Sequence, residues 1–221
     1  MVKDYKAVVF DMDGVIFDSE VKVVECWKVI ADKYHIPDIE TTCIDCMGQN
    51  QAMAKEKFLA KYGEDFPYVE YKKEMSDLFH SRYDNGRLPM KPGVVEILKY
   101  LKAQGKLIAL ASSTRREVVT RELRDAGVLN YFDAVICGDM VSKSKPEPDI
   151  FIKACEELGV KTNEAYAIED SHNGIKAASR GGLRPIMVPD LMPVNQEMKE
   201  LSLDILDSLL EVKTYLENLS H

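Results

Sequence analysis

Two carboxylates stand two residues apart, directly after the first apolar run of the chain. The run from Ala7 to Phe10 predicts a buried strand, and Asp11, Asp13 and Gly14 come after it. Because alternate residues of an extended strand point to the same side, both carboxylates can face one small volume. Two anions that close repel each other unless a cation neutralises them. Mg²⁺ suits such oxygen ligands beside a phosphate, so we expect a magnesium site here.

Further polar residues follow three later apolar runs. They are Ser112-Ser113-Thr114 after 106–111, Gly138-Asp139 with Lys143 and Lys145 after 133–137, and Glu169-Asp170-Ser171 after 165–168. In open α/β sheets, ligands bind outside the carboxyl ends of the strands, so these residues are expected to share one edge. Each segment alone has a plainer interpretation, such as a solvated turn or a helix cap. Together they supply a nucleophile, an acid, a cation and hydroxyls, as phosphoryl transfer with Mg²⁺ requires.

The second part of the chain alternates helices and strands. The pattern predicts helices at 93–104, 115–126, 147–158 and 172–180, strands at 106–111, 133–137, 165–169 and 185–188, and a final helix at 204–219. A glycine follows each of the first four helices, as is common at helix ends. The fold class is therefore α/β, with a Rossmann-like parallel sheet and helices on both faces.

The segment after the first strand has a different pattern. It predicts helices at 20–34, 49–62 and 68–83, with Gly63 and Pro67 as breakers and no convincing strand. We therefore expect an inserted, all-helical cap domain at 18–87 and a catalytic core domain at 1–17 and 88–221. Trp27 shares the apolar stripe of the first of these helices, so we expect it in the core of the cap.

Composition limits the possible partners. The 221 residues are 46% hydrophobic and 30% charged, with a net charge of −8. An acidic chain gives no support for nucleic-acid binding, and no apolar run approaches the length of about 20 residues that a membrane span needs. The N-terminal residues lead straight into a strand, so we expect no signal peptide. Five cysteines do not suggest a disulfide framework, which favours the cytoplasm and free thiols at Cys43 and Cys46.

Four segments resemble the ordered motifs of the haloacid dehalogenase superfamily. They read Asp11-Met-Asp13-Gly-Val-Ile-Phe-Asp18-Ser19-Glu20, Leu-Ala-Ser112-Ser113-Thr114, Ser144-Lys145-Pro146-Glu-Pro148-Asp149-Ile-Phe and Ile-Glu169-Asp170-Ser171-x-x-Gly174. The resemblance covers essentially the whole chain, in the branch whose cap is inserted just after the first motif. It implies a cap that closes over the active site and, as for many relatives, a monomer.

The resemblance also implies a role for each motif residue. Asp11 would be the nucleophile, and Asp13 the general acid and base. Asp11, the backbone carbonyl of Asp13 and Asp170 would hold Mg²⁺, with Glu169 at the metal or just behind it. The phosphoryl group would be bound by Ser112, by the backbone of Ser113 and by Lys145, which would bridge this group and Asp11. Lys145 is preferred to Lys143 because it directly precedes Pro146 at a helix start.

The residues also favour one reaction within the superfamily. Dehalogenases usually lack the second carboxylate, whereas an alkoxide leaving group needs an acid, so Asp13 favours phosphate monoester hydrolysis. A mutase of the β-phosphoglucomutase type would carry a histidine on the first cap helix and an arginine in the second cap segment. Helix 20–34 has no histidine, and 47–51 has no arginine. We therefore predict a phosphatase, with a mutase and a catalytically weak binding or regulatory protein as the alternatives.

Substrate choice would then fall to the cap. The candidates that could face the site are Ser19, Glu20, Lys22, Gln49, Asn50 and Lys55. For each of them, a solvated helix face is an equally good interpretation. The polar Asn50 and Gln51 hint at a small sugar or polyol phosphate as the substrate.

Overall fold

The computed structural model describes residues 5–47 and 51–219 of the chain. Its described residues form a six-stranded sheet in the order β3-β2-β1-β4-β5-β6, in which all neighbouring strands run parallel. The strands are β1 (Ala7–Phe10), β2 (Leu107–Ser112), β3 (Ala134–Cys137), β4 (Ala165–Glu169), β5 (Arg184–Met187) and β6 (Asp204–Ile205). The predicted parallel α/β fold is confirmed.

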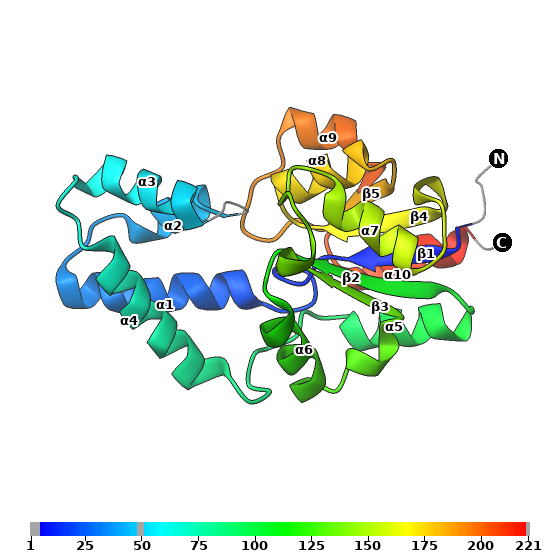
Figure 1. The fold of residues 1–221 in the computed structure, drawn as a ribbon, viewed down its shortest axis with the longest axis horizontal. Coiled ribbons are helices and arrows are strands. Elements are labelled where there is room, and N and C mark those ends of the chain that lie inside the picture. The colour runs from blue at the N-terminus through cyan, green and yellow to red at the C-terminus, as the bar shows by residue number, and fades with distance from the viewer. Residues whose placement is uncertain (1–4, 48–50, 220–221) are drawn as a thin grey trace.

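Helices cover both faces of this sheet (Figure 1). They are α5 (Val94–Ala103), α6 (Arg116–Asp125), α7 (Asp149–Glu157), α8 (His172–Arg180), α9 (Gln196–Leu201) and α10 (Leu209–Asn218). Alternate residues of β1 point to opposite faces. Val8 and Phe10 join the core beneath α5, α6 and α10, whereas Ala7 and Val9 join the core beneath α7 and α8. Burial on both faces explains why β1 is apolar throughout.

The end of the chain differs from the prediction. A single helix over 204–219 was expected, but residues 204–205 form the edge strand β6 and α10 begins only at Leu209. The Ser208 hydroxyl caps this helix by accepting a hydrogen bond from the Glu211 amide at 3.3 Å. The prediction was wrong at this point because pairing of β6 with β5 is a tertiary contact, which helical periodicity does not reveal. Helix α9, capped by Asn195, was also not predicted.

Four helices form a separate lobe at one end of the molecule (Figure 1). This helical lobe comprises α1 (Ser19–Tyr34), α2 (Ile39–Asp45), α3 (Gln51–Tyr62) and α4 (Tyr68–Tyr83), of which α2 was not predicted. The lobe has its own hydrophobic core, which contains Trp27 as expected. The ring of Trp27 lies 5.0 Å from that of Phe58.

Two chain segments join the helical lobe to the sheet, and they run side by side. The Asp18 amide donates to the Pro89 carbonyl at 2.9 Å, and the Lys91 amide donates to the Ile16 carbonyl at 2.9 Å. These hydrogen bonds fix the start of α1 close to the end of β1. The first residues of the lobe therefore lie beside the predicted catalytic motif.

Candidate active site

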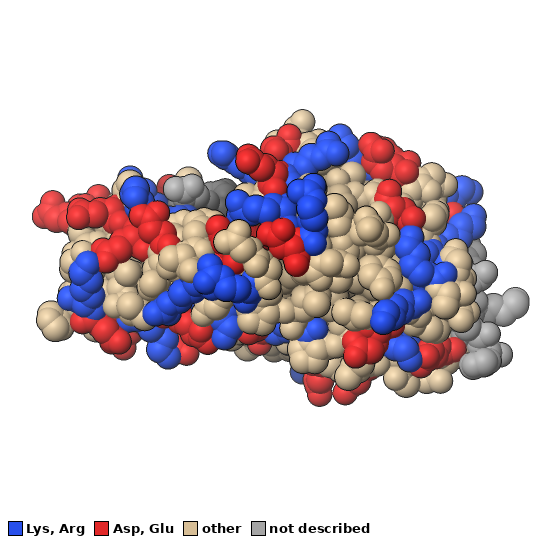
Figure 2. Space-filling view, turned by 90° about the horizontal axis from the view of Figure 1, so that it is seen from below, with Lys and Arg blue, Asp and Glu red and all other residues tan. Residues whose placement is uncertain are grey.

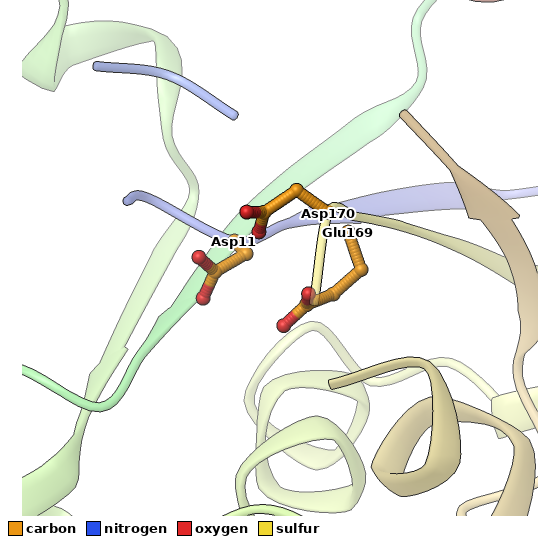
Figure 3. A group of neighbouring side chains, drawn as sticks. All are labelled: Asp11, Glu169 and Asp170. Carbon is orange, nitrogen blue, oxygen red and sulfur yellow. The ribbon is translucent and has the colours of Figure 1, made fainter. Parts of the chain in front are cut away.

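The site begins at the carboxyl ends of the three central strands. Asp11 follows β1, Ser112 ends β2 and Glu169 ends β4, and β1 is hydrogen-bonded to both of the other strands. The Asp11 amide donates to the Ile168 carbonyl at 2.9 Å, which keeps Asp11 in line with the sheet. Figure 3 shows the carboxylates of Asp11, Glu169 and Asp170 gathered at this edge. The parallel register thus brings together residues about 160 positions apart in sequence.

Lys145 links two of these carboxylates. Its Nζ donates to Asp11 Oδ1, to Glu169 Oε1 at 2.7 Å and to the Ala111 carbonyl at 3.1 Å. Burial alone would lower the pKa of this amine, but Asp11 and Glu169 hold it above its usual value. Lys145 is therefore a fixed positive charge against Asp11. Lys143, the other lysine of this loop, is exposed.

Asp13 has a different set of partners. Its Oδ1 accepts a 2.6 Å hydrogen bond from the Ser19 hydroxyl, and its Oδ2 accepts a 3.3 Å hydrogen bond from Thr114. Burial raises the pKa of Asp13, while these two hydrogen bonds lower it. A carboxyl group with a raised pKa, held in place by hydroxyls, can both donate and accept a proton.

Glu169 has both of its oxygens occupied. Oε1 accepts from Lys145, and Oε2 accepts from the amide of Ser171 at 2.8 Å and from its hydroxyl at 2.9 Å. Gly174 lies so close that an added Cβ would be 1.7 Å from Glu169 Oε1. These contacts favour a supporting role for Glu169, which orients Lys145.

Asp170 is the carboxylate that fits a metal ion. Its side chain is buried, and Oδ2 has no hydrogen-bond partner among the described residues. Oxygens of Asp11, Glu169 and Asp170 lie within 4.8 Å of one another. Burial raises the pKa of Asp11 to about 8 and that of Asp170 well above its usual value, and a cation between them would offset this effect. An all-oxygen donor set of this kind suits Mg²⁺.

Comparison with known proteins identifies the family of this chain. Residues 8–188 match the family described as haloacid dehalogenase-like hydrolase. The chain belongs to this family. It is 30% identical to the phosphorylated carbohydrates phosphatase of Thermotoga maritima, over 82% of this chain and 83% of that protein. It is also 30% identical to the β-phosphoglucomutase of Bacillus subtilis, over 91% of this chain and 93% of that protein.

A solved structure extends the likeness to the fold. The CbbY protein of Rhodobacter sphaeroides, a variant crystallised with xylulose 1,5-bisphosphate, superposes with a TM-score of 0.74 at 25% identity. The match covers 94% of this chain and 96% of that one. The protein is therefore a haloacid dehalogenase-like hydrolase with the fold that its motifs indicate.

The candidate active-site residues of this hydrolase, Ser112 excepted, open onto one cavity of about 680 Å³, between the sheet edge and the helical lobe. The sheet side is lined by Asp11, Asp13, Ser113, Thr114, Ser144, Lys145, Glu169, Asp170 and Ser171. The lobe side is lined by Ser19, Glu20, Val23, Trp27, Cys43, Cys46, Met47, Ala54, Phe58, Tyr68, Lys72 and Met75. The cavity is thus polar at the strand ends and largely apolar at the lobe.

Ser112 differs from the other predicted site residues. Its side chain is fully buried beneath the cavity wall, and Oγ accepts a 3.1 Å hydrogen bond from the Thr114 amide. Ser113 and Thr114 line the cavity in its place. The phosphate-binding role of Ser112 stays a prediction.

The cap candidates fall into three groups. Ser19 and Glu20 line the cavity. Lys22 instead pairs with Glu25 at 2.7 Å, and Lys55 is exposed. Gln49 and Asn50 lie outside the described residues. The prediction of a sugar or polyol phosphate, which used Asn50, therefore stays a prediction.

A second group of carboxylates lies beside the first and was not predicted from the sequence. Oxygens of Glu20, Asp170 and Asp190 lie within 4.8 Å of one another, and burial raises the pKa of Glu20 to about 8. Lys91 donates to Asp190 at 2.7 Å and to Asp18 at 3.3 Å. Asp190 follows β5, and ligands bind outside the carboxyl ends of parallel strands, so its position in the sequence could have indicated it. No motif pointed to Tyr68, Lys72 or Met75.

The cysteine thiols, the hydropathy of the helices and the surface charge were also predicted from the sequence. Cys43 and Cys46 are free, as predicted, and burial raises the pKa of Cys43 to about 12, which keeps its thiol protonated. None of the helices within residues 5–47 and 51–219 is long and apolar enough to cross a membrane. Figure 2 shows acidic and basic side chains interspersed over the face in view. The monomeric state and the cytoplasmic location stay predictions.

Proposed function

We propose that this hydrolase is a Mg²⁺-dependent phosphatase that acts on a small phosphate monoester through an aspartyl-phosphate intermediate. One observation carries the proposal: Asp11, held by Lys145, and Asp13, held by Ser19 and Thr114, line the same cavity. One carboxylate is thus fixed by a cation as a nucleophile, and the other is fixed by hydroxyls as an acid. The two carboxylates have the separate tasks that monoester hydrolysis needs.

The proposed reaction has two steps. In the first, a carboxylate oxygen of Asp11 attacks phosphorus, the bond from phosphorus to the ester oxygen breaks, and Asp13 gives its proton to the departing alcohol. In the second, Asp13 takes a proton from water, the water oxygen attacks phosphorus, and inorganic phosphate leaves as Asp11 is restored. Lys145 stabilises the added negative charge throughout.

The metal would be held by Asp11, Asp170 and the backbone carbonyl of Asp13. When bound, Mg²⁺ supplies positive charge that offsets the charge developing on the transferred phosphoryl group. Ser113 lines the phosphate end of the cavity, and we keep Ser112 as its predicted partner there. Residues 18–87, which contain the helical lobe, would act as a cap domain on a core of 1–17 and 88–221.

The relatives support both the reaction and the substrate class. One is named as a phosphatase of phosphorylated carbohydrates, and another was crystallised with a sugar bisphosphate. These names favour a sugar phosphate, as the sequence suggested.

A mutase is the second candidate, because one relative is a β-phosphoglucomutase. Its reaction needs a proton carrier for the sugar hydroxyl. The lobe side of the cavity contains no histidine among the described residues, and α1 contributes Ser19, Glu20, Val23 and Trp27 to it. Water is therefore the expected acceptor of the phosphoryl group.

The deciding assay measures phosphate release with Mg²⁺ from a panel of sugar and polyol phosphates, with β-glucose 1-phosphate included. Free phosphate from several esters would support the phosphatase. Glucose 6-phosphate formed from β-glucose 1-phosphate without free phosphate would show a mutase. Neither product from any ester, in a protein that still binds Mg²⁺, would favour a binding or regulatory role.

A further inference from the structure

One face of helix α4 forms part of the cavity wall. Tyr68, Lys72 and Met75 line the cavity, and they are spaced four and three residues apart along the helix. Residues at that spacing lie above one another on one side of a helix. Lys72 is therefore directed at the same space as the catalytic carboxylates, from the opposite wall.

Lys72 lacks a polar partner within the part of the chain that the structure describes. Among the described residues it makes no hydrogen bond and no ion pair, although it is only partly exposed. Its neighbour Lys73 differs, because it is exposed and pairs with Asp77 at 2.6 Å. A partly buried ammonium without a counter-ion is unusual, since desolvation penalises its charge.

Lys72 lies on the lobe side of the cavity, whereas Lys145 lies on the sheet side. Burial alone lowers the pKa of its amine, and no carboxylate contributes to the shift. The cavity therefore has two cationic ends, one at Lys145 and one at Lys72.

The wall around Lys72 is apolar and aromatic. Trp27, Phe58 and Met75 line this side, and each is almost fully buried. Such surroundings strengthen the attraction between the ammonium and an anion that enters, because little water competes. They also offer contact to the C–H surface of a carbon chain or a sugar ring.

We propose that Lys72 recognises a second anionic group of the substrate, so that the enzyme acts on phosphate monoesters that also carry a carboxylate or a second phosphate. This inference rests on the proposed function for the identity of the first end, where the ester phosphate meets Asp11 and Lys145. The substrate would span the cavity with one anion at each wall, and the carbon skeleton between them would contact Trp27 and Phe58.

Non-hydrolysable phosphonates test this inference without turnover. Butylphosphonate is compared with 4-phosphonobutanoate, and hexylphosphonate with 6-phosphonohexanoate, by calorimetry in the presence of Mg²⁺. The members of each pair differ only in the terminal carboxylate, and the two lengths allow for the span of the cavity. In the wild type we expect the carboxylate to tighten binding about tenfold at one length at least, as a charged hydrogen bond does.

Three variants test whether the tighter binding of the carboxylated phosphonates depends on Lys72. Lys72→Met should abolish it, while Lys72→Arg, which keeps the charge, should retain most of it. The matched control Lys73→Met should behave as the wild type. Equal affinity within both pairs would overturn the inference, and so would a preference that persists in Lys72→Met.

Substrate assays separate this inference from the proposed function. 6-Phosphogluconate and sorbitol 6-phosphate make the same comparison with a polyol skeleton. Hydrolysis without any carboxylate preference would overturn the role of Lys72 and leave the phosphatase intact. Tighter binding of the carboxylated phosphonates, lost in Lys72→Met, without hydrolysis of any ester would support Lys72 and overturn the phosphatase.

Discussion

Ser19, the first residue of α1, donates a 2.6 Å hydrogen bond to Oδ1 of Asp13. The bond joins the helical lobe to the carboxylate that would transfer protons. It also lowers the pKa of Asp13, which burial raises. The position of the lobe therefore affects the pKa of the carboxyl group that we propose as the general acid.

Replacing Ser19 with Ala should lower kcat about tenfold, because a hydrogen bond to a charged group is lost. It should also move the pH optimum upward, because the pKa of Asp13 rises without this donor. A pH profile of kcat with Mg²⁺ measures both effects. Ser19→Thr keeps the hydroxyl and should restore the profile, and Ser81→Ala, at an exposed position, should not change it. An unshifted profile for Ser19→Ala would remove Ser19 from the mechanism.

Asp11→Asn should reduce phosphate release at least about a thousandfold, because an amide is a poor nucleophile toward phosphorus. The fold should persist, since the amide keeps the shape of the carboxyl group. Phosphate release and a thermal melt measure the two outcomes. Asp77→Asn, on the exposed face of α4, is the matched control. Turnover retained in Asp11→Asn would refute the aspartyl-phosphate.

EDTA should abolish phosphate release by the enzyme, and added Mg²⁺ should restore it.

Asp170 belongs to two carboxylate groups, one with Asp11 and Glu169 and one with Glu20 and Asp190. If the metal lies on the Asp11 side, Asp170→Asn should weaken Mg²⁺ binding about a hundredfold and Asp190→Asn less than about tenfold. Calorimetric titration with Mg²⁺ compares them. Equal losses would mean that the metal lies between Asp170 and Asp190.

The metal-free protein should lose stability as the pH rises. Burial raises the pKa of Asp11 and of Glu20 to about 8 in the folded state, against about 4 in the unfolded chain. Between these values the folded state binds more protons, so the free energy of unfolding falls with increasing pH. Tm in EDTA should therefore be lower at about pH 8 than at about pH 5.5. Added Mg²⁺ should reduce this difference in Tm between the two pH values. A Tm that climbs with pH in EDTA would contradict this prediction.

Gly174→Ala should destabilise the fold by about 2 kcal/mol, because its Cβ would be placed 1.7 Å from Glu169 Oε1. It should also impair turnover, since Glu169 orients Lys145. Gly181→Ala is the control, because the nearest atom to its Cβ is 3.2 Å away. Denaturant unfolding of both variants provides the comparison. Similar stability of the two would mean that the Glu169 carboxylate moves aside at little cost.

The sequence alone determined the sheet edge and the residues that gather there. Apolar runs predicted β1, β2 and β4, and in a parallel sheet the residues after such strands must share one edge. Asp11, Ser113 and Glu169 could be placed in this way. The edge strand β6 could not, because a strand of two residues carries no periodicity and depends on its neighbour β5.

The tertiary structure decided what faces that edge. Glu20 meets Asp170 and Asp190, and Lys72 faces the cavity, only because the helical lobe folds back over the strand ends. These contacts join residues far apart in sequence, and each helix of the lobe has several polar residues that could equally have faced solvent. Helical periodicity shows which face of a helix is apolar. Only the packing of the lobe against the sheet edge selects which polar residues line the cavity.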